Sequence, residues 1–224
     1  MKLAHPDWEK PMILDGEKVP IISIENPRCL YDTLTELEEE IRTGMGNFVL
    51  SSGSKILDIK KKFLFVASPW SMDLNDRKLT AKLLACFMER AQDEIYYRKS
   101  EELCGSIQSW LEELATAIPL PVAYDLDIDL GALFKALHVH MEDQDRSLAE
   151  KMLTFMKSWD ILCGETGFAF YGFRNLMPLE ERHLFYENAK EENLNFILIE
   201  GPCHDTIEAE GLFIIDKDLC QIFE

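Results

Sequence analysis

The sequence lacks the glycine-rich loops that bind nucleotide phosphates. It contains neither a G-x-x-x-x-G-K-[ST] loop nor a G-x-G-x-x-G fingerprint. The turn after the first long strand pattern, residues 25–28, has no glycine. Ser52-Gly53-Ser54-Lys55 lacks both a second glycine and a hydroxyl residue after the lysine. These absences argue against ATP hydrolysis.

Other signatures of catalysis, zinc binding and membrane insertion are also missing. There is no G-x-S-x-G nucleophile elbow, and the six cysteines form no C-x-x-C pair. No apolar run reaches the roughly 18 residues that a membrane span needs, and residues 1–10 lack the apolar core of a signal peptide. We expect a cytoplasmic protein with reduced thiols, no catalytic residues and no membrane partner.

Positive charge is scarce and unevenly distributed. The 224 residues carry 23 Lys and Arg against 41 Asp and Glu, a net charge of −18. Residues 55–99 reverse the balance with a net charge of +4, which leaves −22 for the remainder. This basic island predicts an anionic partner, although lysines before an apolar strand can also serve only solubility. Its cations are Lys55, Lys60, Lys61, Lys62, Arg77, Lys78, Lys82, Arg90, Arg98 and Lys99.

The two ends of the chain show an alternation of strands and helices that is typical of the α/β class. Near the N-terminus, apolar β-branched residues are followed by an Asn-Pro helix start and a second apolar run. The C-terminal part repeats the pattern. We expect strands at 19–24, 63–67, 168–171, 194–199 and 212–215, helices at 27–43 and 178–191, and a discontinuous α/β head domain of residues 1–70 plus 164–224.

The middle of the chain is mainly helical. Residues 76–118 carry one apolar stripe that includes Leu103, Trp110 and Leu114, and Gly105 is a candidate kink. A second helical pattern covers residues 145–162. We therefore expect an inserted, mainly α-helical leg domain at 71–163.

Alternating carboxylates between residues 125 and 129 suggest a cation site. If this segment is extended, Asp125, Asp127 and Asp129 share one face and repel one another. A Ca²⁺ ion would remove that repulsion, although the spacing is not that of an EF-hand. The alternative is a solvated acidic turn in which Asp129 caps the next helix.

Several segments taken in order resemble the accessory adaptation protein of type II-A CRISPR loci, the fourth protein of those operons. The resemblance covers nearly the whole chain as a pattern of segments, without one signature motif. Length, acidity and the order of α/β and helical parts also agree. The matching segments are 10–16, 63–88, 133–137 with 139–142, 194–202 and 212–216.

The resemblance implies a homotetrameric ring without catalytic activity that threads onto free ends of double-stranded DNA. It implies a P-loop-like α/β head that has lost its phosphate loop. The CRISPR integrase pair and the RNA-guided nuclease are the implied partners in spacer acquisition. The island would supply the DNA-facing cations, and Ca²⁺ would be held among Asp125, Asp127, Asp129, Glu142 and Asp143.

Two other functions stay open at this stage. The α/β order alone would fit a nucleotide-binding P-loop-like enzyme, against which the missing loop argues. A structural adaptor that does not bind DNA would leave the basic island without a role.

Overall fold

The computed structural model describes residues 1–142, 147–203 and 205–223. The chain forms two compact units, which we call the head (Met1–Asp73 with Gln144–Glu224) and the leg (Leu74–Asp143). The predicted leg of residues 71–163 therefore extends too far toward the C-terminus, because residues 148–163 form part of the head.

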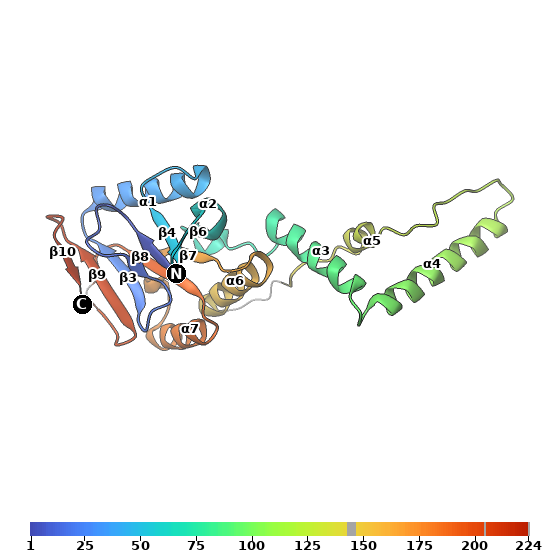
Figure 1. Ribbon diagram of the computed structural model, residues 1–224. Coiled ribbons are helices and arrows are strands. Elements are labelled where there is room, and N and C mark those ends of the chain that lie inside the picture. Colours follow the sequence, from blue (N-terminus) through green and yellow to red (C-terminus); the bar gives the residue numbers. More distant parts are fainter. Residues whose placement is uncertain (143–146, 204, 224) are drawn as a thin grey trace. The chain divides into compact units, whose positions relative to one another are not determined.

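The head is built on a six-stranded sheet, which confirms the α/β class (Figure 1). Five strands run parallel, and the C-terminal strand pairs antiparallel with its neighbour. The inner strands are buried along most of their length because helices cover both faces of the sheet. The sheet order is β10(Gln221–Phe223)-β9(Glu210–Ile215)-β3(Val19–Ile24)-β8(Asn195–Glu200)-β7(Gly167–Tyr171)-β6(Phe63–Val66).

Helices cover the sheet on opposite faces. In Figure 1, α1(Pro27–Thr43) lies above the sheet and α7(Leu179–Glu191) lies below it. The helix expected in the leg, α6(Leu148–Cys163), packs beside α7. Its Met152 and Met156 are fully buried, and the Phe155 ring lies 6.0 Å from that of Phe168 in β7. This apolar face is what assigns α6 to the head.

A second, smaller sheet belongs to the head and was not expected. It is antiparallel, in the order β2(Met12–Ile13)-β1(Lys2–Ala4)-β4(Val49–Ser52)-β5(Lys55–Leu57). Leu3 and Leu50 pair across it and are buried in the head core. The short helices of the head are α2(Ile59–Lys62), η1(Pro69–Ser71) and η2(Arg174–Leu176).

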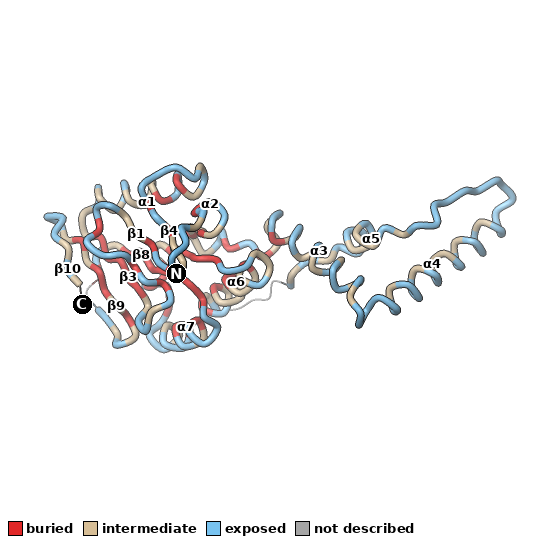
Figure 2. The backbone as a smooth tube through the Cα atoms, in the orientation of Figure 1, coloured by how far each residue is buried: buried red, intermediate tan, exposed pale blue. Residues whose placement is uncertain are grey.

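The leg consists of α3(Arg77–Gln92), α4(Tyr97–Ala117) and α5(Leu130–Ala136). The helical run breaks after α3, where the Asp93 carboxylate accepts the amides of Ile95 and Tyr96, and α4 continues through Gly105. No residue of α4 is buried, as the exposed colouring in Figure 2 shows. Among the described residues, no helix has the length and apolarity needed to cross a membrane.

Candidate nucleic-acid interface

The head contributes four cations of the basic island from two neighbouring elements. Lys55 begins β5, and the three lysines of α2 follow Asp58, the residue before that helix. Lys61 pairs with the Asp58 carboxylate at 3.1 Å, and Lys62 Nζ donates to the Cys163 carbonyl at 2.9 Å. Among the described residues, Lys55 and Lys60 have no such partner, so their exposed ammonium groups remain available for an anion.

The leg contributes the other six cations. Asp76 caps α3 by accepting the amides of Lys78 and Leu79, which orients the first turn that bears Arg77 and Lys78. Arg90 pairs with Asp93 at 3.4 Å, and Arg98 pairs with Glu102 at 2.9 Å. Exposed side chains without an ion pair or hydrogen bond to the described residues are Arg77, Lys82 and Lys99.

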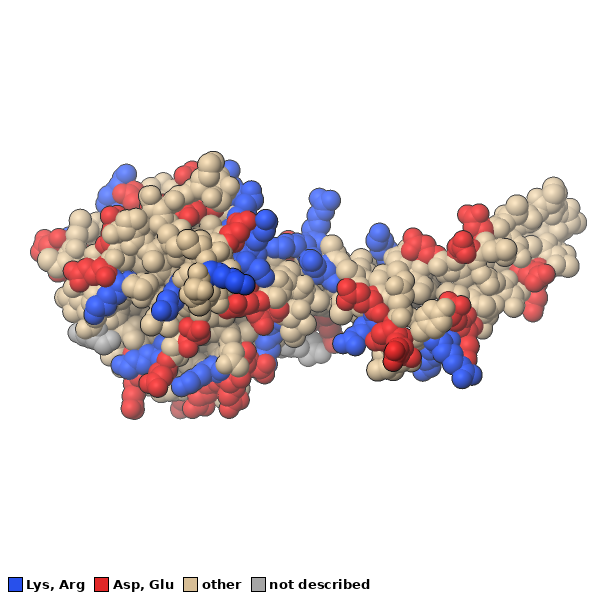
Figure 3. Space-filling view, in the orientation of Figure 1, with Lys and Arg blue, Asp and Glu red and all other residues tan. Residues whose placement is uncertain are grey.

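The leg cations do not form one stripe. On the face of the leg shown in Figure 3, basic and acidic side chains alternate, and neither sign forms a continuous band. The structure thus divides the ten cations into two groups. Those with an ion pair or hydrogen bond, which we call tied, include Lys61, Lys62, Arg90 and Arg98. Those without one among the described residues, which we call free, are the five exposed cations named above. Sequence counting alone treated all ten alike.

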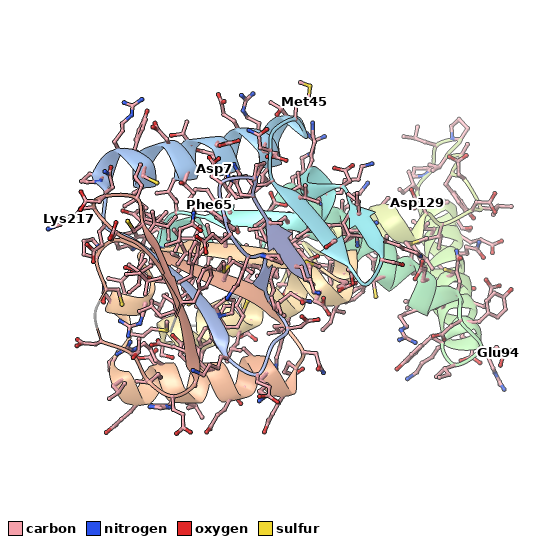
Figure 4. All side chains as sticks on the ribbon, turned by 60° about the vertical axis from the view of Figure 1, so that its left-hand side comes forward. Asp7, Met45, Phe65, Glu94, Asp129 and Lys217 are labelled. Atoms are coloured by element: carbon pink, nitrogen blue, oxygen red, sulfur yellow. The ribbon has the colours of Figure 1, made fainter. Side chains whose placement is uncertain are left out.

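The carboxylates proposed to bind calcium lie in irregular chain. Residues 118–129 form neither helix nor strand, and the carboxylates of Asp125, Asp127 and Glu142 belong to exposed residues. Asp129, labelled in Figure 4, accepts the Ala132 amide at 3.1 Å and caps α5. Asp143 lies outside the described residues. Within the described ranges, no three His, Cys, Asp or Glu side chains are placed to hold a metal ion.

The start of α1 shows why the head offers no phosphate loop. The Asn26 side chain accepts the amides of Arg28 at 3.0 Å and Cys29 at 3.1 Å, and Pro27 has no amide hydrogen. The Leu30 amide bonds to the Asn26 carbonyl. A helix N-terminus binds phosphate through free amides, and here the chain itself has used them.

Sequence reasoning missed a buried ionic cluster on the α7 side of the sheet. Glu210 accepts both Arg174 Nε and Nη2 at 2.9 Å and the Tyr186 hydroxyl at 2.8 Å. Burial acts to raise the pKa of Glu210, but the hydrogen bonds from Arg174 and Tyr186 outweigh it and lower that pKa. Burial raises the pKa of Glu200, which accepts the Arg174 amide. The cluster also stabilises the segment between β8 and β9, where the Ile207 amide donates to Glu210. No spacing of residues in the sequence predicts these contacts.

The comparisons with known proteins agree with the resemblance noted in the sequence. No curated protein matches the chain. The crystal structure of Stu0660 of Streptococcus thermophilus is similar, with a TM-score of 0.56 and 14% identity. The similarity covers 96% of this chain and 75% of that chain and bears on the fold.

A family model described as CRISPR-associated protein (Cas_Csn2) matches residues 42–219. The match spans head and leg and most of the chain, which confirms the resemblance to the CRISPR accessory family. The protein therefore belongs to the Cas_Csn2 family of CRISPR-associated proteins.

Proposed function

We propose that the protein is a non-enzymatic accessory factor of type II-A CRISPR adaptation that binds double-stranded DNA. In this proposal it forms a homotetrameric ring in the cytoplasm, threads onto free DNA ends and supports spacer acquisition with the integrase pair and the RNA-guided nuclease. Membership of the Cas_Csn2 family is the observation that carries the proposal.

The charge distribution supports DNA as the anionic partner. The free cations Lys55 and Lys60 of the head and Arg77, Lys82 and Lys99 of the leg are exposed in a chain of net charge −18. Phosphate contacts need no base-reading element and confer little sequence preference. An otherwise acidic surface would repel DNA except at these cations.

The exposed apolar surface of the leg supports self-association. Trp110 on α4 is 58% exposed, and Leu120 in the following loop is 69% exposed. The chain carries no charged residue between Glu113 and Asp125, so this end of the leg is apolar as well as exposed. Surfaces of this kind are typical of protein–protein contacts, and a ring of identical subunits would cover them.

Calcium is part of the proposal as an ion shared between copies. One chain places too few carboxylates together within the described residues, whereas Asp125, Asp127 and Glu142 are exposed and could meet ligands from a second copy. Carboxylate oxygens are suitable Ca²⁺ ligands. Adding a chelator should lower the mass seen by light scattering, and an unchanged mass would remove calcium from the proposal.

The head is also proposed to be a P-loop-like domain that has lost nucleotide binding. Its five parallel strands are consistent with that origin, and the amides at the start of α1 are occupied by Asn26. Stoichiometric ATP binding in calorimetry would favour the enzyme alternative instead.

Duplex binding is tested by fluorescence anisotropy with several unrelated linear duplexes over a salt series. We expect similar affinities for all sequences and a log–log salt slope of about −0.9 for each phosphate neutralised. Absence of binding at low salt would favour a structural adaptor. A strong preference for one sequence would contradict phosphate-based recognition.

A further inference from the structure

An apolar groove of about 740 Å³ lies in the leg, between α3, the start of α4 and α5. The rings of Phe87 and Phe134, whose centroids are 5.6 Å apart, both line it. Ile95 and Leu103 line it as well, and both are exposed, Ile95 to 76%. Exposed apolar surfaces of this kind are typical of contacts with another chain.

The groove is positively charged, although the chain has a net charge of −18. Arg90 and Lys99 line it, and none of its described lining residues is an aspartate or a glutamate. Arg90 pairs with Asp93 at 3.4 Å, whereas Lys99 has no ion pair or hydrogen bond among the described residues. By charge complementarity, the groove suits an occupant that combines apolar side chains with a carboxylate.

The same chain presents a segment with this chemistry. Residues 120–125 lead from α4 toward α5 and form neither helix nor strand, as Figure 1 shows. Every residue from 116 to 127 is exposed. Because side chains alternate along an extended chain, Leu120, Val122 and Tyr124 can share one side of this segment, and Asp125 follows them. Since groove and segment are both exposed in one copy, they do not cover each other within it.

The groove and the segment also match in length. The α4 side of the groove runs from Tyr96 to Leu103, which is about 10 Å at the rise of an α-helix. The stretch from Leu120 to Tyr124 spans about 13 Å when it is extended. Three apolar side chains therefore fit along the groove, and the Asp125 carboxylate comes directly after the last of them.

We propose that residues 120–124 of one copy lie in the α3–α4 groove of a second copy, with Asp125 paired to Lys99. This inference rests on the proposed self-association and names the two surfaces that carry it. A reciprocal exchange would cover both grooves and both segments of a pair of copies. It uses Lys99 for assembly, so that the other free cations would contact the DNA, and it leaves Asp127 and Glu142 for the proposed calcium ion.

Cys86 is a free thiol that lines the groove, so the contact can be tested by cross-linking. The full chain with Val122→Cys, treated with a short bis-maleimide, should give a covalent dimer on a denaturing gel. Adding Cys86→Ser should remove that dimer. Leu179→Cys is the matched control, because Leu179 is 49% exposed in the head and Val122 is 47% exposed. It should give no dimer that depends on Cys86.

A charge exchange tests the ion pair. Lys99→Glu should weaken self-association at least about tenfold in a dilution series followed by light scattering, because it sets two like charges against each other. Adding Asp125→Lys should restore most of that loss, which a merely structural role of Lys99 would not allow.

The outcomes separate this inference from the proposed ring. An oligomer that forms no Cys86-dependent dimer and shows no rescue would overturn the inference and leave the ring intact, with the groove open to a different acidic partner. A Cys86-dependent dimer in a chain whose mass never exceeds that of two copies would support the contact and contradict the ring. A chain that stays monomeric and forms no such dimer would overturn both.

Discussion

The side chain of Asn75 pairs with both backbone polar groups of Met141, at opposite ends of the leg sequence. Its Nδ2 donates to the Met141 carbonyl at 3.0 Å, and its Oδ1 accepts the Met141 amide at 2.9 Å. The Thr80 hydroxyl bonds in turn to the Asn75 carbonyl at 3.1 Å. This arrangement fastens the segment after α5 to the start of α3 in a unit that has little buried core.

Replacement of Asn75 by Ala should loosen the leg selectively. It leaves two partly buried backbone groups without their partner, at a cost of about 1–3 kcal/mol. Hydrogen exchange should speed up at the Met141 amide and in α5 but not in the strands of the head. Asn188→Ala is the control, since among the described residues that side chain bonds only to the Leu184 carbonyl of its own helix. Unchanged exchange at Met141 would show that the pairing does not hold the leg.

The Glu210 cluster should give the head a defined acid sensitivity. Because the folded-state pKa of Glu210 is lowered, its contribution to stability is present above the unfolded pKa near 4.3. It is lost as pH falls through the lower folded pKa. Glu210→Gln should cost about 3–5 kcal/mol at neutral pH, because it leaves the buried Arg174 guanidinium without its carboxylate.

Urea unfolding at several pH values measures this effect. The difference between Glu210→Gln and the unmodified chain should be largest near neutrality and shrink in acid. A difference that stays constant with pH would show that the ion pair with Arg174 is not its source.

Free and tied cations should differ in their effect on DNA binding. Lys60→Gln removes an exposed charge that has no partner in the part of the chain that the structure describes, so affinity for a linear duplex should fall. The salt slope should decrease by about 0.9 if Lys60 contacts one phosphate. Lys62→Gln is the matched variant from the same helix, and its Nζ is already bonded to the Cys163 carbonyl. It should affect thermal stability more than the salt slope. Equal slopes for the two variants would contradict this division.

The apolar face of the leg should control assembly. Trp110→Glu places a charge on the exposed side of α4 and should lower the oligomer mass in light scattering, because the charge would be buried between subunits. The monomer should keep its helix content. Trp70→Glu is the control, because Trp70 is 88% exposed in the head. If the mass is unchanged with Trp110→Glu, subunits do not meet through this face.

The five parallel strands of the central sheet were predicted from the sequence because most of their residues are buried, whereas the short edge strand Gln221–Phe223 was missed. Val19–Ile24 and Asn195–Glu200 are mainly apolar and almost wholly buried, and short apolar stretches such as 196–199 have few competing interpretations. The small sheet was missed because strands such as Met12–Ile13 are too short to show a period. The helix Leu148–Cys163 was predicted but assigned to the wrong unit, since periodicity shows an apolar face and not what covers it.

The site residues were harder to predict than the fold. Asp129 caps α5, as the alternative to calcium binding predicted, and such a local interaction can be suggested by the spacing of residues. The buried cluster of Arg174, Tyr186 and Glu210 depends on the sheet order, which brings separate segments together. Likewise, Lys62 differs from Lys60 because its ammonium group bonds to the Cys163 carbonyl, which lies far away in the sequence. The pair of Lys61 with Asp58, in contrast, is an i,i+3 contact that charge spacing can suggest.

Retention on DNA of different topology is the most direct test of the proposed threading. The same duplex is immobilised through one blocked end in linear form, or offered as a closed circle, and the protein retained at moderate salt is measured. The account predicts that the protein loads through the open end and is retained on the linear duplex, and that it binds the closed circle much more weakly. Equal retention on the linear duplex and the closed circle would contradict a ring that loads at DNA ends.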